Sequence, residues 1–316
     1  MGIQVITTGL DLNKKTALNF FDNLIKIRTV EKKIATEYQK NIIRCPVHLS
    51  IGQEGVATAV SFALDKKDYF ISNHRSHAHY LAKNGSIFKM FCEILGKKNG
   101  CSKGHGGSMH LIDLDKNFLG STAIVSSSIP VGIGYAEGIK IQKKKQKMCI
   151  FIGDASVEEG VFYEAANYAV LKNLPVIFLC ENNSYSVYTH IDKRQPRNRK
   201  IYNIAKSIGL NSLHINEKCP YKIYDRLKRF LKEKNYPIFI EIPTWRYLEH
   251  CGPNDDDNLK YRSSKEVIFW KKNDPIILAE KHLKLKYKIS DELISSRYKF
   301  FESKVSSLFN KAFNSK

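Results

Sequence analysis

The sequence predicts an α/β fold with a mostly parallel central sheet flanked by helices. Four short apolar runs alternate with helical patterns, at residues 68–72 (DYFIS), 148–152 (MCIFI), 176–180 (VIFLC) and 238–242 (IFIEI). Runs of this length and composition are typical of strands that are buried on both faces of a parallel sheet. With 316 residues, 43% of them hydrophobic, the chain can bury a sizeable core.

The first element is an amphipathic helix over residues 14–40. Its apolar residues recur close to helical spacing, with lysines and glutamates between them: Leu18, Phe21, Leu24, Ile25, Ile27 and Ile34. A further helix is expected between the second and third strands. Its apolar residues fall on one broad face: Val157, Val161, Phe162, Ala165, Ala166, Ala169 and Val170. A right-handed crossover through this helix would place the two strand ends side by side or one strand apart.

The composition changes past about Asp255. Charge density rises there, and lysine-rich helical patterns continue to Lys316. We therefore predict one α/β domain over residues 1–255 and a helical extension over residues 256–316.

The formal net charge is high, 51 lysines and arginines against 31 aspartates and glutamates, or +20. This charge is spread along the chain, and the densest clusters are residues 143–145 and the RQPRNRK segment at residues 194–200. Neither cluster is interleaved with the aromatic residues on which single-stranded nucleic acids stack. The charge is thus interpreted as solvated surface, although RQPRNRK remains a candidate contact for a phosphate or a partner. We expect no nucleic-acid partner.

Cysteine usage and apolar runs bear on the compartment. The seven cysteines show no C-x-x-C pair and no zinc-like spacing, which fits a reducing environment. Residues 1–28 carry neither a signal peptide nor a transit peptide pattern, and no run approaches the roughly 20 apolar residues of a membrane span. A cytoplasmic protein without a membrane partner is expected.

Mostly polar residues follow each predicted strand. They are Asn73, His74 and Arg75 after the first strand, Gly153 and Asp154 after the second, Glu181, Asn182 and Asn183 after the third, and Arg246 and His250 after the fourth. Ligands of open parallel sheets bind beyond the carboxyl ends of the strands. Asp154 and Asn183 can reach a common point there, and such oxygen ligands suit Mg²⁺, which often completes its coordination with substrate phosphates. The adjacent helix N-terminus would favour an anion.

Structural interpretations of the same residues stay open. Ser156 and Glu159 fit the S-x-x-E capping box, so both residues can serve only to start a helix. Asp154 alone would more often be a turn residue than a ligand. Lone histidines are more often structural, and His77, His79, His105 and His110 receive no role.

Several motifs then point to one family. Gly153-Asp154-Ala155 and Asn182-Asn183, separated by 26 residues, resemble the thiamine diphosphate signature, usually Gly-Asp-Gly followed by a similar gap and Asn-Asn. HLSIGQE at residues 48–54, GGSMH at 106–110, EEGVFYEAANYA and LPVIFLCENN occur in the family's order. The chain resembles, from about residue 15 to 280, the alpha subunit of a thiamine-diphosphate-dependent 2-oxo acid dehydrogenase, of the pyruvate or acetoin dehydrogenase first-component type. The resemblance implies a thiamine diphosphate-binding domain over residues 1–255, with thiamine diphosphate and Mg²⁺ as cofactors.

The resemblance also implies roles for single residues. Asp154 and Asn183 match magnesium ligands, with the backbone carbonyl of Tyr185 as a third, and Arg75 matches the arginine on the diphosphate. His48, before the Gly-Gln-Glu motif, and His250, on a loop that is mobile in the family, match active-site histidines and are the expected catalytic residues. Further cofactor contacts are expected from residues beside these: His74, Val125 (through its backbone, to the aminopyrimidine), Gly153, Ala155, Ser156 and His250 itself.

Activity and partners follow as expectations from the same resemblance. In the family a separate beta subunit supplies the glutamate that activates the aminopyrimidine, so we expect an α2β2 heterotetramer with active sites at its interfaces. The default reaction is oxidative decarboxylation of pyruvate, a small 2-oxo acid, with acetyl transfer to a lipoyl-bearing acyltransferase. SNHRSHAHYLAKNG at residues 72–85 also resembles acetoin-type relatives, so an acetoin-type or other thiamine-dependent dehydrogenase subunit is the alternative.

Some residues depart from the family pattern. Ala155 replaces a signature glycine, serines occupy positions 126–128 where glycines are common, and His74 stands where many relatives have tyrosine. Cys251 replaces the serine that animal pyruvate dehydrogenases phosphorylate, so that regulation is not expected. These departures keep a degenerate, non-catalytic subunit as a rival, which would not bind the cofactor even with its beta partner.

Two other classes are less well supported. A dinucleotide-binding dehydrogenase needs G-x-G-x-x-G after its first strand, whereas GIGYAEG at Gly132 lacks that order and lies in a helical pattern. A basic nucleic-acid-binding module would need clustered charge and a salt-dependent affinity.

Overall fold

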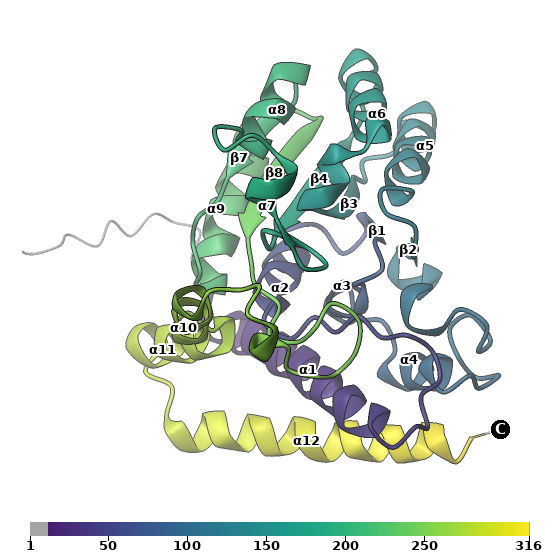
Figure 1. Cartoon of the computed structure of the whole chain (residues 1–316), viewed down its shortest axis with the longest axis vertical. Helices are drawn as coiled ribbons and strands as arrows, with labels where there is room; N and C mark the ends of the chain where they lie inside the picture. Colours follow the sequence, from purple (N-terminus) through teal and green to yellow (C-terminus); the bar gives the residue numbers. More distant parts are fainter. Residues whose placement is uncertain (1–11, 316) are drawn as a thin grey trace, which may run out of the picture.

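The computed structural model describes residues 12–315, and its centre is a six-stranded parallel sheet in the order β2-β1-β3-β4-β8-β7 (Figure 1). The strands are β1 (Tyr69–Ser72), β2 (Phe118–Ser121), β3 (Met148–Gly153), β4 (Val176–Asn182), β7 (Asn211–His214) and β8 (Ile238–Pro243). A separate two-stranded hairpin pairs β5 (Tyr185–Ser186) with β6 (Thr189–His190). The predicted α/β fold class is confirmed.

Helices cover both faces of the sheet. One face packs against α1 (Lys14–Tyr38), α2 (Glu54–Ala63), α3 (His77–Ala82), α4 (Ile87–Ile94) and α9 (Pro220–Glu233), with α11 (Pro275–Tyr287) and α12 (Asp291–Phe313) joined to the same apolar cluster. The other face packs against α5 (Ser128–Ile141), α6 (Gly160–Leu171) and α8 (Ile201–Ile208). Two further helices, α7 (Ile191–Arg194) and α10 (Ser264–Lys272), lie on the loops that surround the candidate site described below.

Strand β3 illustrates why the central strands are continuous apolar runs. Cys149 and Phe151 enter the cluster on one face, while Met148, Ile150 and Ile152 enter the cluster on the other. Successive side chains of a strand point to opposite faces, and here both faces are covered by helices. All four runs predicted as strands form strands, β1, β3, β4 and β8.

The helix at the start of the chain is also confirmed. It spans Lys14–Tyr38, and Asn13 caps it by accepting a hydrogen bond from the Thr16 N–H at 2.8 Å. The predicted start of the helix between β3 and β4 is wrong. A short 3-10 helix, Asp154–Glu158, follows β3, and α6 begins only at Gly160 after Glu159, which makes no side-chain capping bond. Ser156 is instead buried, at 4% exposure, so the chain keeps residues 154–158 folded against the sheet edge.

The C-terminal helices join the same core as the first helix. Figure 1 shows α12 running along α1, and its buried residues Phe301, Val305 and Phe309 belong to the cluster that α1 enters. Arg28 of α1 donates hydrogen bonds to Glu54 of α2 and to Asp274, which caps α11. These contacts join the two segments in one core. The division into residues 1–255 and 256–316 stays a prediction.

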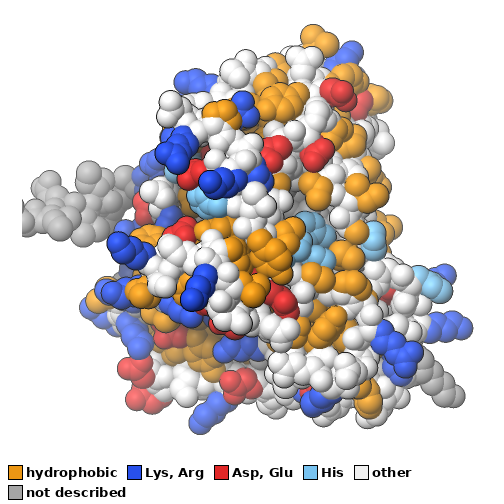
Figure 2. Space-filling view, viewed as in Figure 1, with side chains coloured by type: hydrophobic (Ala, Val, Ile, Leu, Met, Phe, Trp, Pro, Cys, Tyr) orange, Lys and Arg blue, Asp and Glu red, His pale blue; other side chains and the backbone are white. Residues whose placement is uncertain are grey.

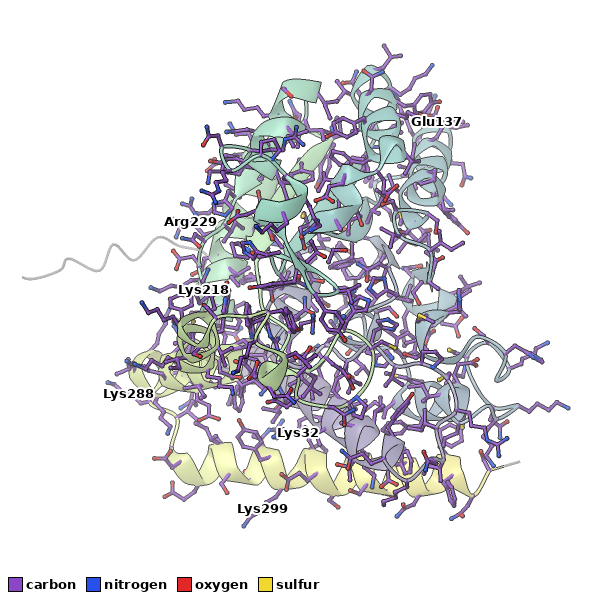
Figure 3. The ribbon with its side chains drawn as sticks, in the orientation of Figure 1. Lys32, Glu137, Lys218, Arg229, Lys288 and Lys299 are labelled. Atoms are coloured by element: carbon purple, nitrogen blue, oxygen red, sulfur yellow. The ribbon has the colours of Figure 1, made fainter. Side chains whose placement is uncertain are left out.

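The positive charge is dispersed over the described surface. Lys32, Lys218, Lys288 and Lys299 extend from four different elements or loops in Figure 3. None of the helices formed by residues 12–315 combines the length and apolarity that a membrane span requires.

Candidate active site

A cavity of about 200 Å³ lies beyond the carboxyl ends of β1, β3 and β4. All the residues predicted for the site line it: His48, His74, Arg75, Val125, Gly153, Asp154, Ala155, Ser156, Asn183, Tyr185 and His250. They come from six separate segments of the chain, so they are brought together by the tertiary fold and not by their proximity in the sequence. Their individual roles remain predictions.

Asp154 lies on the floor of this cavity. Strands β3 and β4 are direct neighbours with Gly153 paired to Glu181, which sets Asp154 beside the end of β4. The Asp154 side chain is buried, and burial raises the pKa of its carboxyl group, although the Arg194 guanidinium opposes the shift. Arg194 of α7 pairs with Asp154 and with Glu158 at the same time. In this state a protein cation neutralises the buried carboxylate.

Asn183 supplies an amide oxygen to the same cavity. Its Oδ1 accepts a hydrogen bond from the Tyr185 N–H at 2.9 Å, which fixes the turn after β4 and leaves one lone pair on this oxygen. The Tyr185 side chain is buried and donates its hydroxyl to Glu266 Oε2 at 3.0 Å. Asn182 turns away, because its Nδ2 donates to Glu241 Oε1 at 2.8 Å. The oxygen atoms that could bind a cation in the cavity are therefore those of the Asp154 carboxylate, the Asn183 amide and the backbone around Tyr185.

Arg75 is the buried cation of the site. Its Nη1 donates to the Leu49 carbonyl at 2.7 Å and its Nη2 donates to the His250 carbonyl at 2.9 Å. Burial and the nearby Arg246 lower the Arg75 pKa to about 10, so the guanidinium stays charged at neutral pH. Arg75 thus links the segment that carries His48 to the loop that carries His250, and presents a positive charge to the cavity.

Three histidines form a cluster at one wall of the cavity. The ring centroids are 4.8 Å apart for His48 and His74, 5.0 Å for His48 and His250, and 5.4 Å for His74 and His250. Burial, followed by repulsion from Arg75, lowers the pKa of His48 to about 2, that of His74 to about 3 and that of His250 to about 4. All three imidazoles are neutral at physiological pH. In the space-filling view, histidine side chains reach the surface near the middle of this face among apolar ones (Figure 2).

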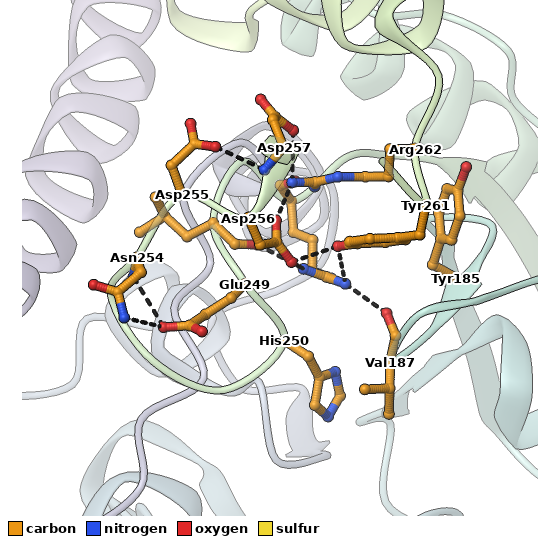
Figure 4. Close-up of polar contacts among 12 residues, drawn as sticks. Tyr185, Val187, Glu249, His250, Asn254, Asp255, Asp256, Asp257, Tyr261 and Arg262 are labelled. Carbon is orange, nitrogen blue, oxygen red and sulfur yellow. Dashed lines mark hydrogen bonds and ion pairs between the residues drawn. The ribbon is translucent and has the colours of Figure 1, made fainter. Parts of the chain in front are cut away.

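A buried network of charges anchors the loop after β8, which carries His250 (Figure 4). Arg262 pairs with Asp256 and donates to Asp257 at 2.8 Å and to the Arg246 carbonyl at 2.8 Å. Arg246 donates to the Tyr261 hydroxyl at 2.9 Å and to the Val187 carbonyl at 2.6 Å, which ties the loop to the β5–β6 hairpin. In this structure the loop is therefore anchored on two sides, and its mobility stays an expectation from the family resemblance.

The HLSIGQE segment is positioned by contacts with the same loop. The Gly252 N–H donates to the Val47 carbonyl at 2.8 Å, and the Tyr247 N–H donates to the Ile51 carbonyl at 3.0 Å. Gly52 has a φ of 100°, and a Cβ atom built on it would lie 2.4 Å from the Trp245 carbonyl oxygen. A glycine is required there because the two segments approach so closely. This approach brings His48 to His250.

The departures from the family pattern are compatible with the backbone of the site. Ala155 lies in the 3-10 helix Asp154–Glu158 and is not among the residues with positive φ, so its methyl group adds no left-handed strain. Ser126 does have a left-handed φ of 65°, which costs a non-glycine residue about 1–2 kcal/mol. Its hydroxyl compensates in part by donating to the Ser156 carbonyl at 3.2 Å, which joins the segment before α5 to the 3-10 helix.

The donor set fits a hard cation with a phosphate-bearing ligand. A buried carboxylate, an amide oxygen with a free lone pair and backbone oxygens match the ligands that Mg²⁺ prefers. Arg75 supplies a complementary charge for an anion. Glu181 Oε1 is buried and has no hydrogen-bond partner in the described chain, which is the state expected of an atom that faces a bound group.

Sequence reasoning gave no role to some residues of the site. Glu181 is held by a buried chain in which His79 Nε2 contacts Glu181 Oε2 at 3.0 Å and His79 Nδ1 contacts Ser72 Oγ at 2.7 Å. Gln53 and Met109 line the cavity, and both lie within motifs that were recognised as units. The contact between Arg194 and Asp154 spans 40 residues and has no sequence signal.

Comparisons with known proteins agree with this geometry. The family model described as dehydrogenase E1 component matches residues 22–316. The pyruvate dehydrogenase E1 component subunit alpha of Rickettsia bellii is 35% identical over 266 residues, covering 83% of this chain and 80% of that protein. The subunit of the same name in Rickettsia felis is 34% identical over 271 residues, covering 85% and 82%. A mitochondrial counterpart from Pisum sativum is 33% identical over 258 residues, covering 79% of this chain and 62% of that protein.

Proposed function

The chain belongs to the dehydrogenase E1 component family, as the alpha subunit of a thiamine-diphosphate-dependent 2-oxo acid dehydrogenase of the pyruvate dehydrogenase type, and we propose from this how its cavity works. The proposed reaction is decarboxylation of pyruvate followed by acetyl transfer to the lipoyl group of an acyltransferase. The observation that carries the proposal is that Asp154, Asn183 and Arg75 meet in one cavity.

We propose that Asp154 and Asn183, with the backbone carbonyl of Tyr185, hold Mg²⁺. This ion would either share the Asp154 carboxylate with Arg194 or displace Arg194 from it. Arg75 would hold the diphosphate together with the backbone of residues 153–156, because a buried guanidinium forms strong charge-assisted bonds to phosphate oxygens. The backbone of Val125 would contact the aminopyrimidine ring.

Bound thiamine diphosphate would supply a nucleophilic carbon and a sink for the electrons released when carbon dioxide leaves. The part of this chain is to orient the substrate and to stabilise developing charge. His48 and His250 are neutral, so each offers an N–H donor and an acceptor nitrogen to an oxygen in the cavity. An anionic diphosphate beside Arg75 would offset the repulsion that lowers the pKa of His250, and would let that imidazole hold a proton at higher pH.

Membership as an alpha subunit implies a beta subunit partner, and we propose an α2β2 assembly. A surface beside the cavity supports such a partner. The exposed apolar side chains on α5, on α6 and on the segment before α5 are Ile124, Val125, Val131, Tyr135, Ile141, Tyr163, Tyr168 and Leu171. Apolar patches of this kind mark protein interfaces more often than free surface. Because Val125 belongs to both the patch and the cavity lining, a partner on this patch would also complete the site.

The proposal is tested with the chain co-expressed with its candidate beta subunit. The purified complex should release carbon dioxide from pyruvate in the presence of thiamine diphosphate, Mg²⁺ and an electron acceptor, and neither subunit alone should do so. Acetoin and other 2-oxo acids, assayed in parallel, test the acetoin-type alternative. Decarboxylation by the purified alpha chain alone would contradict the proposed division of the active site.

A further inference from the structure

The histidine cluster has a property that the proposed reaction does not use. The metal-binding atoms of His48, His74 and His250 all lie within 4.8 Å of one another. Among residues 12–315 no other group of three or more His, Cys, Asp or Glu side chains meets this condition. The three residues follow different elements, so the cluster is a product of the tertiary fold.

The other buried histidines near the site give an internal comparison. His77 contacts Glu31 through Nδ1 at 3.1 Å and Ser108 through Nε2 at 2.8 Å, and His79 likewise has a partner on each nitrogen. His48 Nδ1, in contrast, is buried without a hydrogen-bond partner, and the His48 side chain is only 7% exposed. A buried polar atom without a partner is costly, and a bound group would relieve this cost.

The chemical state of the cluster suits a metal ion. Metals bind imidazole nitrogen, and each of these three residues offers one such nitrogen within the same small space. Imidazole nitrogens favour Zn²⁺, Co²⁺, Ni²⁺ and Cu²⁺, whereas Mg²⁺ favours oxygen. The cluster and the oxygen-rich floor of the cavity would therefore select different ions.

The geometry also limits how an ion would bind. Metal–nitrogen distances near 2.0–2.1 Å in a tetrahedral site imply nitrogens about 3.3 Å apart, so the rings must close by about 1.5 Å. His74 and His250 are only partly buried, which leaves them room to rotate. Arg75 Nη2 lies 3.5 Å from His250 Nδ1, so the remaining nitrogen, Nε2, would be the ligand. The carboxylates of Glu31 and Glu181 partly balance the Arg75 charge.

We propose that His48, His74 and His250 form a three-histidine site for a divalent transition metal such as Zn²⁺, separate from the Mg²⁺ site at Asp154 and Asn183. An ion held there would bind both histidines to which the proposed function gives catalytic roles. The site rests on the imidazole geometry and does not depend on the proposed cofactor.

Cobalt(II) is the probe, because its visible absorption reports coordination. The full chain, prepared without a polyhistidine tag, is titrated with Co²⁺ alone and then in complex with its beta subunit. The expected result is one Co²⁺ per chain with the intense absorption of a four-coordinate ion, displaced by stoichiometric Zn²⁺ and retained in excess Mg²⁺. Loss of an outer-shell partner of a metal ligand typically costs 10- to 100-fold in affinity. Loss of a ligand in His74→Tyr should cost at least that much.

His105→Ala is the matched control, since it removes an exposed imidazole outside the cluster. Its Co²⁺ affinity should equal that of the wild type. His250→Asn, which removes a second imidazole of the cluster, should lose Co²⁺ affinity as His74→Tyr does. This second variant decides the question even when His74→Tyr does not fold.

Two results would overturn the proposal: weak octahedral Co²⁺ spectra only, or an affinity in folded His74→Tyr or His250→Asn equal to that of His105→Ala. The same experiments distinguish failure of the histidine site from failure of the proposed cofactor site. A complex that binds Co²⁺ at this site but no thiamine diphosphate leaves the histidine site standing and refutes the proposed function. A complex that binds thiamine diphosphate but no Co²⁺ does the reverse.

Discussion

Replacing Arg194 with glutamine should tighten the binding of Mg²⁺ in the presence of thiamine diphosphate. The Arg194 guanidinium pairs with the Asp154 carboxylate, which is the proposed magnesium ligand, and with Glu158. Mg²⁺ and the guanidinium therefore compete for one buried carboxylate. Arg194→Gln removes the competitor and leaves the ligand intact.

The magnitude follows from the single bond that Mg²⁺ must break. A hydrogen bond to a charged group contributes about 1.5–3 kcal/mol, and each 1.4 kcal/mol is a factor of ten, so the affinity should rise about 10- to 140-fold. Some solvent screening is expected, since the Arg194 side chain is 11% exposed, which favours the lower half of that range. The measurement is a calorimetric titration of the α/β complex with Mg²⁺ at pH 7.5.

Lys193→Gln is the control for this experiment. Lys193 precedes Arg194 on α7 and is exposed, so the substitution removes the same charge without touching Asp154. Its Mg²⁺ affinity should stay near that of the wild type. An unchanged or weaker affinity in a folded Arg194→Gln complex would refute the view that Arg194 competes with the ion.

Three further predictions concern the stability of the chain. The Glu93 carboxylate accepts hydrogen bonds from four backbone N–H groups of the following loop. Glu93→Gln turns an amide NH₂ toward two of these N–H groups, so the free energy of unfolding in urea should fall by about 3–6 kcal/mol. A decrease under 1 kcal/mol would contradict this. Asp256→Asn breaks the buried pair with Arg262 and should cost about 3–5 kcal/mol, with faster proteolysis of the loop at residues 244–263, whereas unaltered protease resistance would count against the network. Burial alone would raise the Asp274 pKa, but Arg28 outweighs it and the pKa is lowered, so the stabilising effect is present above about pH 4 and is lost as the pH falls. Asp274→Asn should thus destabilise the chain at pH 6 and much less at pH 3, and equal losses at both pH values would contradict the sign.

The fold was largely predictable because the central strands are buried on both faces and are therefore continuous apolar runs in the sequence. The edge strands β2 (FLGS) and β7 (NSLH) were missed for the complementary reason, since their side chains are mostly half-buried and mixed in polarity. The start of α6 was misplaced because Ser156 and Glu159 satisfy a local capping pattern. Tertiary burial of Ser156 prevailed over that pattern.

The site was predictable in its residue types and not in its internal contacts. A signature such as Gly153-Asp154 with Asn182-Asn183 identifies strand ends that must converge, and the direct pairing of β3 with β4 makes them converge. No pattern in the sequence predicts that Arg194 pairs with Asp154, or that three histidines from distant segments lie together. Such contacts depend on loop paths, which are fixed by networks like that of Arg246, Asp256 and Arg262.

We propose that this cavity binds thiamine diphosphate through a magnesium ion at Asp154 and Asn183. The most direct measurement is a calorimetric titration of thiamine diphosphate into the α/β complex, with and without Mg²⁺, for the wild type, Asp154→Ala and the exposed control Asp192→Ala. We expect Mg²⁺-dependent binding to the wild type and to Asp192→Ala, and none to folded, assembled Asp154→Ala. Binding that persists in Asp154→Ala, or no binding to a well-assembled wild-type complex, would contradict it.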